Sequence, residues 1–180
     1  EGGYVSGSIF EYCRVEYGGV AAGKGVVMGA TYINSCTFTN NEGGTNGAAV
    51  RAYSPNGGGW PDGDPVKIIN STFTQNDAVA IRWAVDATIT GNIITYNKLG
   101  IWVGGGATTI TDNVITNNTG SGQDAGGIWG NIEPGAVVTI SGNQISDNGS
   151  SGVHIIKQDT GTATATISGN TIVRNNGGGI

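Results

Sequence analysis

The chain has 180 residues, of which 34 are glycine and only 12% are charged, and its formal net charge is −5. Glycine makes up roughly 7% of ordinary chains, but no Gly-X-Y period accompanies the excess, which excludes collagen. The acidic balance leaves no basic stripe of the kind that nucleic acid requires. No apolar stretch approaches the length of a membrane span.

The strongest pattern in the chain is an internal repeat. An apolar residue is followed by a small residue three positions later and by another apolar residue five positions later. Successive starts lie 21 to 35 residues apart, and a repeating chain of this kind indicates a solenoid in which each step is one coil. The seven starts are Phe10, Ile33, Ile68, Ile89, Ile110, Ile140 and Ile167.

Two columns, mostly of asparagine, follow from this alignment. The position three after each start holds Cys13, Cys36, Ser71, Asn92, Asn113, Asn143 and Asn170. The position eight after each start holds Gly18, Asn41, Asn76, Asn97, Asn118, Asn148 and Asn175. Coils stacked at the strand spacing of about 4.8 Å would place each amide against its copies above and below, in a hydrogen-bonded ladder. Asparagine also tolerates the left-handed backbone that a sharp corner needs.

The pattern resembles the right-handed parallel β-helix repeats of the pectate-lyase-like superfamily, from about Phe10 to Ile180. The resemblance implies an all-β, single-stranded parallel β-helix of about six to seven coils. Such repeats occur in polysaccharide lyases, glycoside hydrolases, uronan epimerases, phage tailspikes, adhesins and some ice-binding proteins. Function therefore has to be argued from the outward side chains.

We expect residues 1–180 to form one domain that is a fragment of a longer extracellular or periplasmic solenoid. A solenoid needs caps over its terminal coils, and neither end of the sequence shows one. Either the parent protein continues, or the ends associate with a neighbouring molecule, end to end or laterally.

Cys13 and Cys36 occupy the same column one coil apart. Their Cα atoms could lie within the range that permits a disulfide, but parallel in-register side chains point the same way and small thiols pack well in such a column. We predict free, stacked cysteines.

A second register predicts an outward-facing column on another strand. After each asparagine column the chain re-enters a strand as small-apolar-X-apolar, and strand alternation puts X outside. Indole faces stack on sugar rings, and guanidinium groups bind carboxylates and hydroxyls, so the column suits a carbohydrate chain. An alternative is that these residues only cover a sheet face. Trp83 is predicted to point inward. The outward column reads Val27, Arg51, Arg82, Trp102, Trp129 and His154.

The segment from Tyr53 to Pro65 is rich in glycine and proline and is predicted to be a loop that overhangs this column. Trp60 and Tyr53 are candidate walls of a binding groove together with Trp102 and Trp129. Asp62 and Asp64 are candidate oxygen ligands for Ca²⁺, although solvated turn carboxylates are the preferred interpretation. No cofactor is otherwise required.

Resemblance to β-helical lyases and epimerases implies chemistry on uronic acids, with a group that neutralises the carboxylate and a base. Arg51 or Arg82 would neutralise a uronate, and His154, assisted by Lys157, would exchange the proton. Hydrolysis needs two carboxylates that flank the bond. The acidic residues near the column show no such paired spacing and are Asp86, Asp124, Glu133 and Asp159.

Outward positions on the first strand of four coils form a hydroxyl array: Thr88 and Thr90, Thr109 and Thr111, Thr139 and Ser141, Thr166 and Ser168. Flat threonine ranks of this kind occur in ice-binding solenoids, although threonine is also a favoured strand residue.

Taken with the arginine and indole column, the sequence predicts recognition or processing of an acidic polysaccharide. A non-catalytic surface, adhesin or tailspike-type solenoid and an ice-binding protein remain as alternatives.

Overall fold

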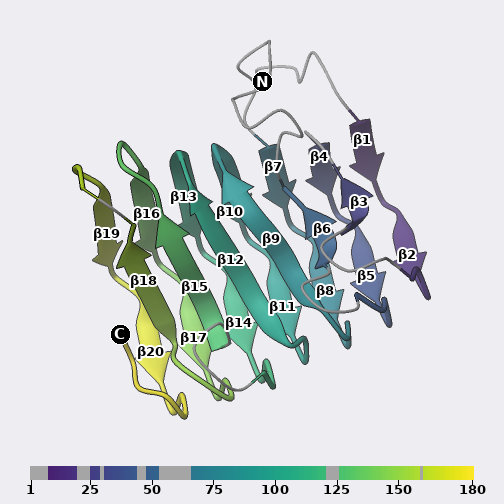
Figure 1. Cartoon of the computed structure of the whole chain (residues 1–180). Coiled ribbons are helices and arrows are strands. Elements are labelled where there is room, and N and C mark those ends of the chain that lie inside the picture. The colour runs from purple at the N-terminus through teal and green to yellow at the C-terminus, as the bar shows by residue number, and fades with distance from the viewer. Residues whose placement is uncertain are drawn as a thin grey trace.

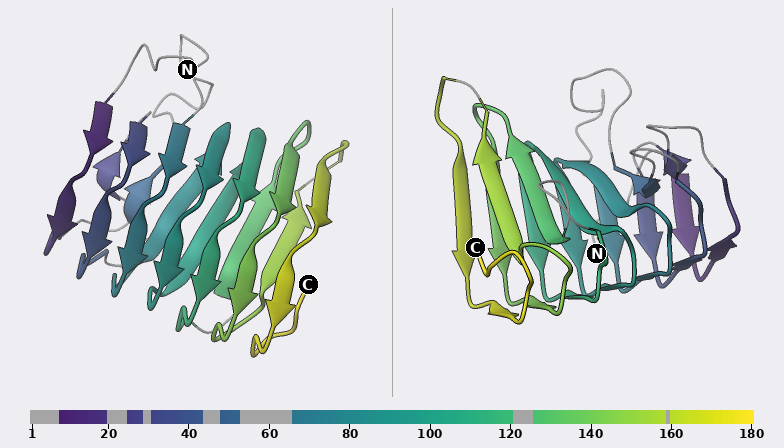
Figure 2. Two further views of the ribbon diagram at one scale, coloured as in Figure 1. Left: turned by 180° about the vertical axis from the view of Figure 1, so that it is seen from behind. Right: turned by 60° about the horizontal axis from the view of Figure 1, so that its bottom comes forward.

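A computed structural model of the chain describes residues 8–19, 25–28, 31–43, 48–52, 66–120, 126–158 and 160–180. Three parallel sheets run along one axis, and each successive coil adds one strand to each sheet (Figures 1 and 2). The first and second sheets have seven strands and the third has six. The predicted all-β parallel β-helix of about six to seven coils is confirmed.

The strands of each sheet share a position in the repeat. The first sheet contains β1 (Ser8–Glu11), β4 (Thr31–Asn34), β7 (Val66–Ile69), β10 (Ala87–Thr90), β13 (Ala107–Thr111), β16 (Val137–Ser141) and β19 (Thr164–Ser168). The second contains β2 (Arg14–Glu16), β5 (Thr37–Thr39), β8 (Thr72–Thr74), β11 (Ile93–Thr95), β14 (Val114–Thr116), β17 (Gln144–Ser146) and β20 (Thr171–Val173). The third contains β3 (Gly25–Met28), β6 (Ala48–Arg51), β9 (Val79–Val85), β12 (Leu99–Gly105), β15 (Gly126–Ile132) and β18 (Val153–Lys157).

The core consists of the repeated apolar positions, stacked coil upon coil. In the first sheet Ile33 pairs with Ile68, which pairs with Ile89, and all three are fully buried. In the second sheet the rings of Phe38 and Phe73 stack with centroids 4.9 Å apart and planes 5° apart. Each coil buries its apolar face only against its neighbours, which is why the repeat has to be kept along the chain.

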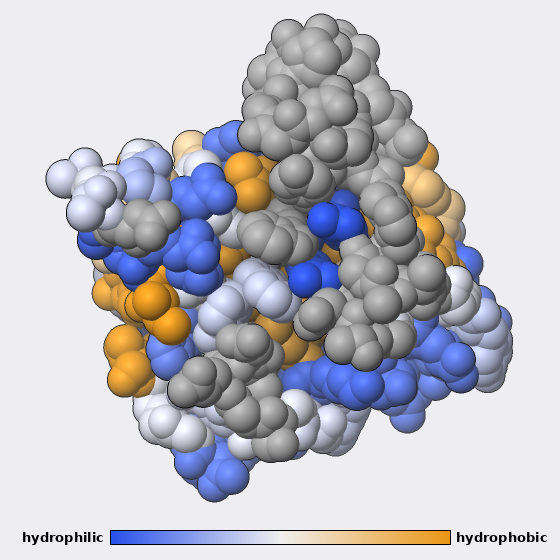
Figure 3. Space-filling view, viewed as in Figure 1, coloured by the Kyte–Doolittle hydropathy of each residue, from blue (hydrophilic) through white to orange (hydrophobic). Residues whose placement is uncertain are grey.

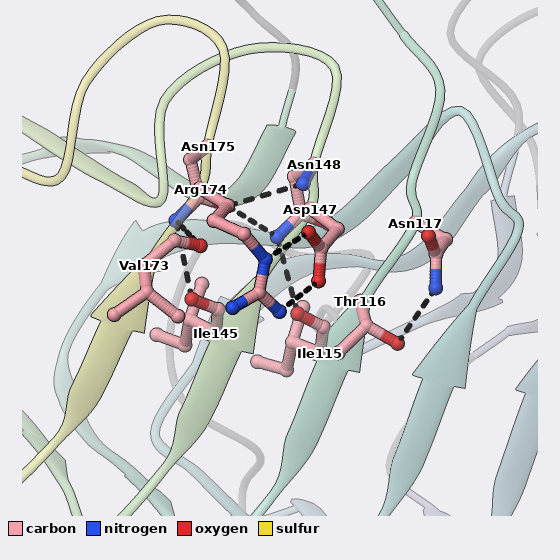
Figure 4. Close-up of polar contacts among 9 residues, drawn as sticks. All are labelled: Ile115, Thr116, Asn117, Ile145, Asp147, Asn148, Val173, Arg174 and Asn175. Atoms are coloured by element: carbon pink, nitrogen blue, oxygen red, sulfur yellow. Dashed lines mark hydrogen bonds and ion pairs between the residues drawn. The ribbon is translucent and has the colours of Figure 1, made fainter.

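Both asparagine columns form the predicted ladders. The side-chain amide of Asn76 donates to Asn97 Oδ1 at 2.8 Å, and that of Asn92 donates to Asn113 Oδ1 at 3.0 Å. The same oxygens also accept the backbone N–H of the preceding coil, at 3.2 Å for Asn76 and 2.9 Å for Asn92. Figure 4 shows the ladder step from Asn148 to Asn175. The ladders therefore satisfy both side chain and backbone at each buried corner.

The left-handed backbone at these corners belongs to the residue before the ladder position. The residues with positive φ in the first corner are Tyr12, Ser35, Asn70, Gly91, Asp112, Gly142 and Gly169. Those in the second corner are Tyr17, Asn40, Gln75, Tyr96, Asn117, Asp147 and Arg174. Tolerance of a left-handed backbone therefore does not explain the ladder asparagines, which come one residue after the left-handed position. They are selected because the amide side chain bonds the backbone of the preceding coil and the side-chain oxygen of the following one.

The stacked position of the two cysteines is confirmed, and both thiols are free. Cys36 Sγ accepts a hydrogen bond from the backbone N–H of Cys13 at 3.4 Å, so it replaces the asparagine oxygen of later coils. Burial raises the pKa of the Cys36 thiol. Cys36 is therefore a structural residue of the ladder.

Candidate functional site

The third sheet carries the column of arginine, indole and imidazole side chains. Its pairing places Arg51 beside Arg82, Arg82 beside Trp102, Trp102 beside Trp129, and Trp129 beside His154 on successive strands. The predicted column is confirmed over these five residues.

The prediction that Val27 points outward as the first member of the column is wrong. Val27 pairs with Val50 and is only 8% exposed in the core, whereas Met28 pairs with Arg51. Two adjacent valines on β3 fit either phase of strand alternation, so the sequence pattern did not fix which of the two points inward.

The predicted inward position of Trp83 stays a prediction. The pairing of β9 with β12 shifts after Arg82, so that Ala84 lies opposite Val103. Ala84 is fully buried in the core, and the side chain of Trp83 lies outside the described part of the structure. A bulge inserts one extra residue into a strand, and an ungapped repeat alignment does not reveal it.

The two indoles lie on the outer face of the third sheet. Ile101 and Ile128, one position before them, belong to the core inside the coils. Trp129 and Trp102 instead pack in a second apolar cluster with Leu99, outside that core. Strand alternation produces this division.

Arg82, Trp102 and Trp129 contact one another in a continuous row along the axis, called the stack below, in which the two indoles meet edge to face. The Arg82 guanidinium lies 4.5 Å from the centroid of the Trp102 ring, a separation that permits a cation–π interaction. The centroids of Trp102 and Trp129 are 4.7 Å apart and their planes meet at 88°. Burial lowers the pKa of Arg82, and the neighbouring charge of Arg51 lowers it further. Positive charge is thus concentrated at one end of the stack.

The stack is less open than the sequence suggested. Arg82 is 7% exposed and Trp129 is 5% exposed, whereas Arg51, Trp102 and His154 are half-buried. Trp129 therefore supports Trp102 and does not offer a free ring face. Figure 3 shows this side of the molecule, where strongly hydrophilic side chains gather over β6 and β9.

Asn131, two residues after Trp129 on β15, is a polar member of this face that the sequence reasoning missed. Its Oδ1 atom and the Trp129 Nε1 atom are buried without a hydrogen-bond partner. An asparagine outside the two ladder columns was the available signal.

The catalytic candidates are not brought together at one point. Arg82 and His154 are separated by three strand steps, about 14 Å at the usual strand spacing. Lys157 lies at the end of β18, where its ammonium donates to the carbonyl of Gly161 at 2.8 Å. Their catalytic role stays a prediction.

The loop candidates Tyr53, Trp60, Asp62 and Asp64 lie outside the described residues, as do Asp124 and Asp159. Within the described ranges no group of three or more histidine, cysteine or acidic residues is placed to hold a metal ion. Nor does that part of the chain contain a helix long and apolar enough to cross a membrane. A Ca²⁺ site at Asp62 and Asp64 stays a prediction.

The hydroxyl array on the first sheet is in register. Thr88 pairs with Thr109, Thr109 with Thr139, and Thr139 with Thr166. The second rank, from Thr90 to Ser168, pairs in the same way, and Thr111 Oγ1 donates to Thr90 Oγ1 at 2.9 Å. The strands β10, β13, β16 and β19 carry no charged residue.

Stacked parallel strands with internal amide ladders define a parallel β-helix. Residues 56–180 match the family model described as "Right handed beta helix region". The chain belongs to this family. Comparisons with curated proteins and with solved structures returned no match.

Proposed function

We propose that the outer face of the third sheet binds an acidic polysaccharide. The observation that supports this most directly is the continuous stack of Arg82 on Trp102 on Trp129, with Arg51 next to it in the same register. Guanidinium groups bind carboxylates, and an indole edge or face packs on the C–H surface of a sugar. Membership of the β-helix family is consistent with a polysaccharide-related or structural role.

The column has the dimensions of a polymer site. Four strand steps separate Arg51 from His154, which corresponds to about 19 Å along the axis. The charged end at Arg51 and Arg82 would hold uronate carboxylates, while Trp102 would contact the neutral part of the chain. The ligand would then lie parallel to the solenoid axis.

Recognition is favoured over turnover. Lyase or epimerase chemistry needs the base and the group that neutralises the carboxylate at the same sugar residue, since the abstracted proton is α to that carboxylate. Arg82 leans onto Trp102 and is three strands away from His154. A surface, adhesin or tailspike-type binding role fits this separation better than the enzymatic alternative.

Binding is tested by affinity electrophoresis through gels that contain pectate, alginate or a neutral glucan. Trp102→Ala and Arg82→Gln are expected to reduce retardation by the acidic polymers. Tyr96→Ala and Arg174→Gln are matched controls, because these side chains are exposed at a corner outside the third sheet. Equal retardation of all four variants and the native protein would refute the proposal, provided that their melting temperatures agree.

Turnover is tested separately by incubation with pectate and alginate, with and without Ca²⁺. Appearance of unsaturated products by ultraviolet absorbance would show lyase activity and contradict a purely binding role. A change in uronate configuration by proton NMR would show epimerase activity.

The in-register hydroxyl array favours a second candidate, ice binding by the first sheet. Its two ranks are charge-free over four coils and repeat at the strand spacing, so they form a regular surface. Thr109→Lys would interrupt the array at its centre, and Thr116→Lys on the second sheet is the control. Unmodified ice crystal growth in the presence of the native protein would dismiss this candidate.

A further inference from the structure

Two buried polar atoms on the outer side of β15 lack a hydrogen-bond partner in the described structure. They are the indole Nε1 of Trp129, whose residue is 5% exposed, and the amide Oδ1 of Asn131. Buried polar groups in folded proteins are nearly always hydrogen-bonded, because an unmet donor or acceptor loses its hydration without compensation. One of these atoms is a donor and the other is an acceptor. Together they specify a partner group that both accepts and donates.

The two side chains face the same way. They are two residues apart on one strand, which places their Cα atoms about 6.6 Å apart on the same face. Gly130 between them faces the core, since a Cβ there would meet Val103 and Ile155. The pairing of β15 with β18 places His154 beside Trp129 and Ile156 beside Asn131. Asn131 therefore extends the outward face of β15 beyond Trp129, the member of the arginine and indole column on that strand.

We infer that Trp129 and Asn131 form a subsite for the hydroxyl edge of a sugar ring, an inference that rests on the proposed polysaccharide binding. The Trp129 N–H donates to one hydroxyl oxygen, and the same hydroxyl or its neighbour donates to Asn131 Oδ1. Hydrogen bonds of about 2.8 Å on either side of a hydroxyl pair are long enough to bridge two positions on the same face of one strand. Arg51 and Arg82 select the negative charge of the polymer, whereas this subsite reads its neutral hydroxyls.

Because both atoms are covered, the sugar edge enters only after neighbouring side chains shift. We therefore expect association slower than at an open, preformed site. A single ordered water is the other group that can satisfy both atoms, and the experiment has to separate it from a sugar.

The test uses the native protein, Trp129→Phe and Asn131→Leu, titrated with oligogalacturonate and with the same oligosaccharide after reduction of its carboxyl groups. Each variant is expected to lose about tenfold in affinity for both ligands, the loss typical of one hydrogen bond. Arg82→Gln is expected to lose affinity for the acidic ligand only. Asn131→Leu should not lower the melting temperature, since it removes an unsatisfied buried group.

A second measurement does not depend on the stability of the variants. The indole N–H resonance of Trp129, assigned by its absence in Trp129→Phe, is expected to shift on titration with the carboxyl-reduced oligosaccharide. An unmoved resonance together with unchanged affinities would show an ordered water only and overturn the subsite while leaving the proposed function intact. Failure of the native protein to bind either ligand would refute the proposed function itself.

Discussion

The amide ladder makes a prediction about Asn113, which is 1% exposed in the middle of the solenoid. Its Oδ1 accepts the backbone N–H of Asn92 at 2.9 Å and the side-chain N–H of Asn92 at 3.0 Å. Its own amide donates to the carbonyl of Ile89 at 3.0 Å and to Asn143 Oδ1 at 2.9 Å. The change Asn113→Ala removes all four hydrogen bonds.

The expected cost follows from the groups that the change leaves behind. The backbone N–H of Asn92 loses its acceptor, and the carbonyl of Ile89 loses a donor. A buried group left unsatisfied costs about 1–3 kcal/mol, so we expect Asn113→Ala to lower the free energy of unfolding by about 2–4 kcal/mol. Asn113→Ser should cost less, because Ser71 already fills this column and its Oγ accepts the backbone N–H of Cys36 at 3.1 Å.

The position of the asparagine along the solenoid provides a further control. Asn170 makes equivalent bonds but is only half-buried, so water can replace part of what Asn170→Ala removes. Urea unfolding gives the free energies, and hydrogen exchange at the Asn92 amide reports the local effect, since coils interact mainly with their neighbours. A loss below about 1 kcal/mol for Asn113→Ala, or equal losses at positions 113 and 170, would refute the argument.

Three further predictions concern the corners and the third sheet. Arg174 donates to Asp147 Oδ1 at 2.7 Å (Figure 4) and so holds the pKa of that carboxyl below its usual value; the stabilisation is present above the ordinary carboxyl pKa and is lost as pH falls through the lowered one. An NMR titration in which Arg174→Gln leaves the Asp147 midpoint unchanged would contradict this. Gly127→Ala is expected to lower the free energy of unfolding by about 3 kcal/mol, because the new Cβ would lie 2.5 Å from the Gly152 carbonyl oxygen. Gly142→Ala should lower it by about 1 kcal/mol, since Gly142 has φ +67 and the new Cβ would clash only with the side chain of Asp112. Chemical denaturation of the two variants checks this order. Cys36, whose burial raises its pKa, should be alkylated by iodoacetamide more slowly than Cys13 in the native protein, as judged by mass spectrometry, and equal native rates would argue against the buried thiol.

The sequence predicted the coil architecture because each coil repeats the same inward positions. An isoleucine at the start, an amide three residues later and a second amide eight residues later are required by stacking, so their register survives changes in coil length. The left-handed corner residues were harder to find. Glycine fills that column in some coils, as at Gly91 and Gly142, but Tyr96 and Arg174 take equivalent corner positions and hide the pattern.

The sequence predicted which way the indole side chains of the site point, but not how far they are buried. Alternation placed Trp102 and Trp129 outside, and the structure agrees. The burial of Trp129 and the orientation of Val27 depend on packing, and the pairing of Ala84 with Val103 depends on a local register shift that no repeat period encodes. The column in the sequence already placed Arg82 and His154 three coils apart, and the structure adds that the Arg82 guanidinium lies on the Trp102 ring.

Every bond between ladder amides has the same sense: the donor lies on the earlier coil and the acceptor on the later one, from Asn41 through to Asn175 and from Asn92 through to Asn170. Two parallel files of amide dipoles therefore add head to tail, and each polarises the next. The interior of this protein is electrically directional. Rotating a single interior amide by half a turn would set oxygen against oxygen on one side and N–H against N–H on the other, so orientation has to be shared by the whole file.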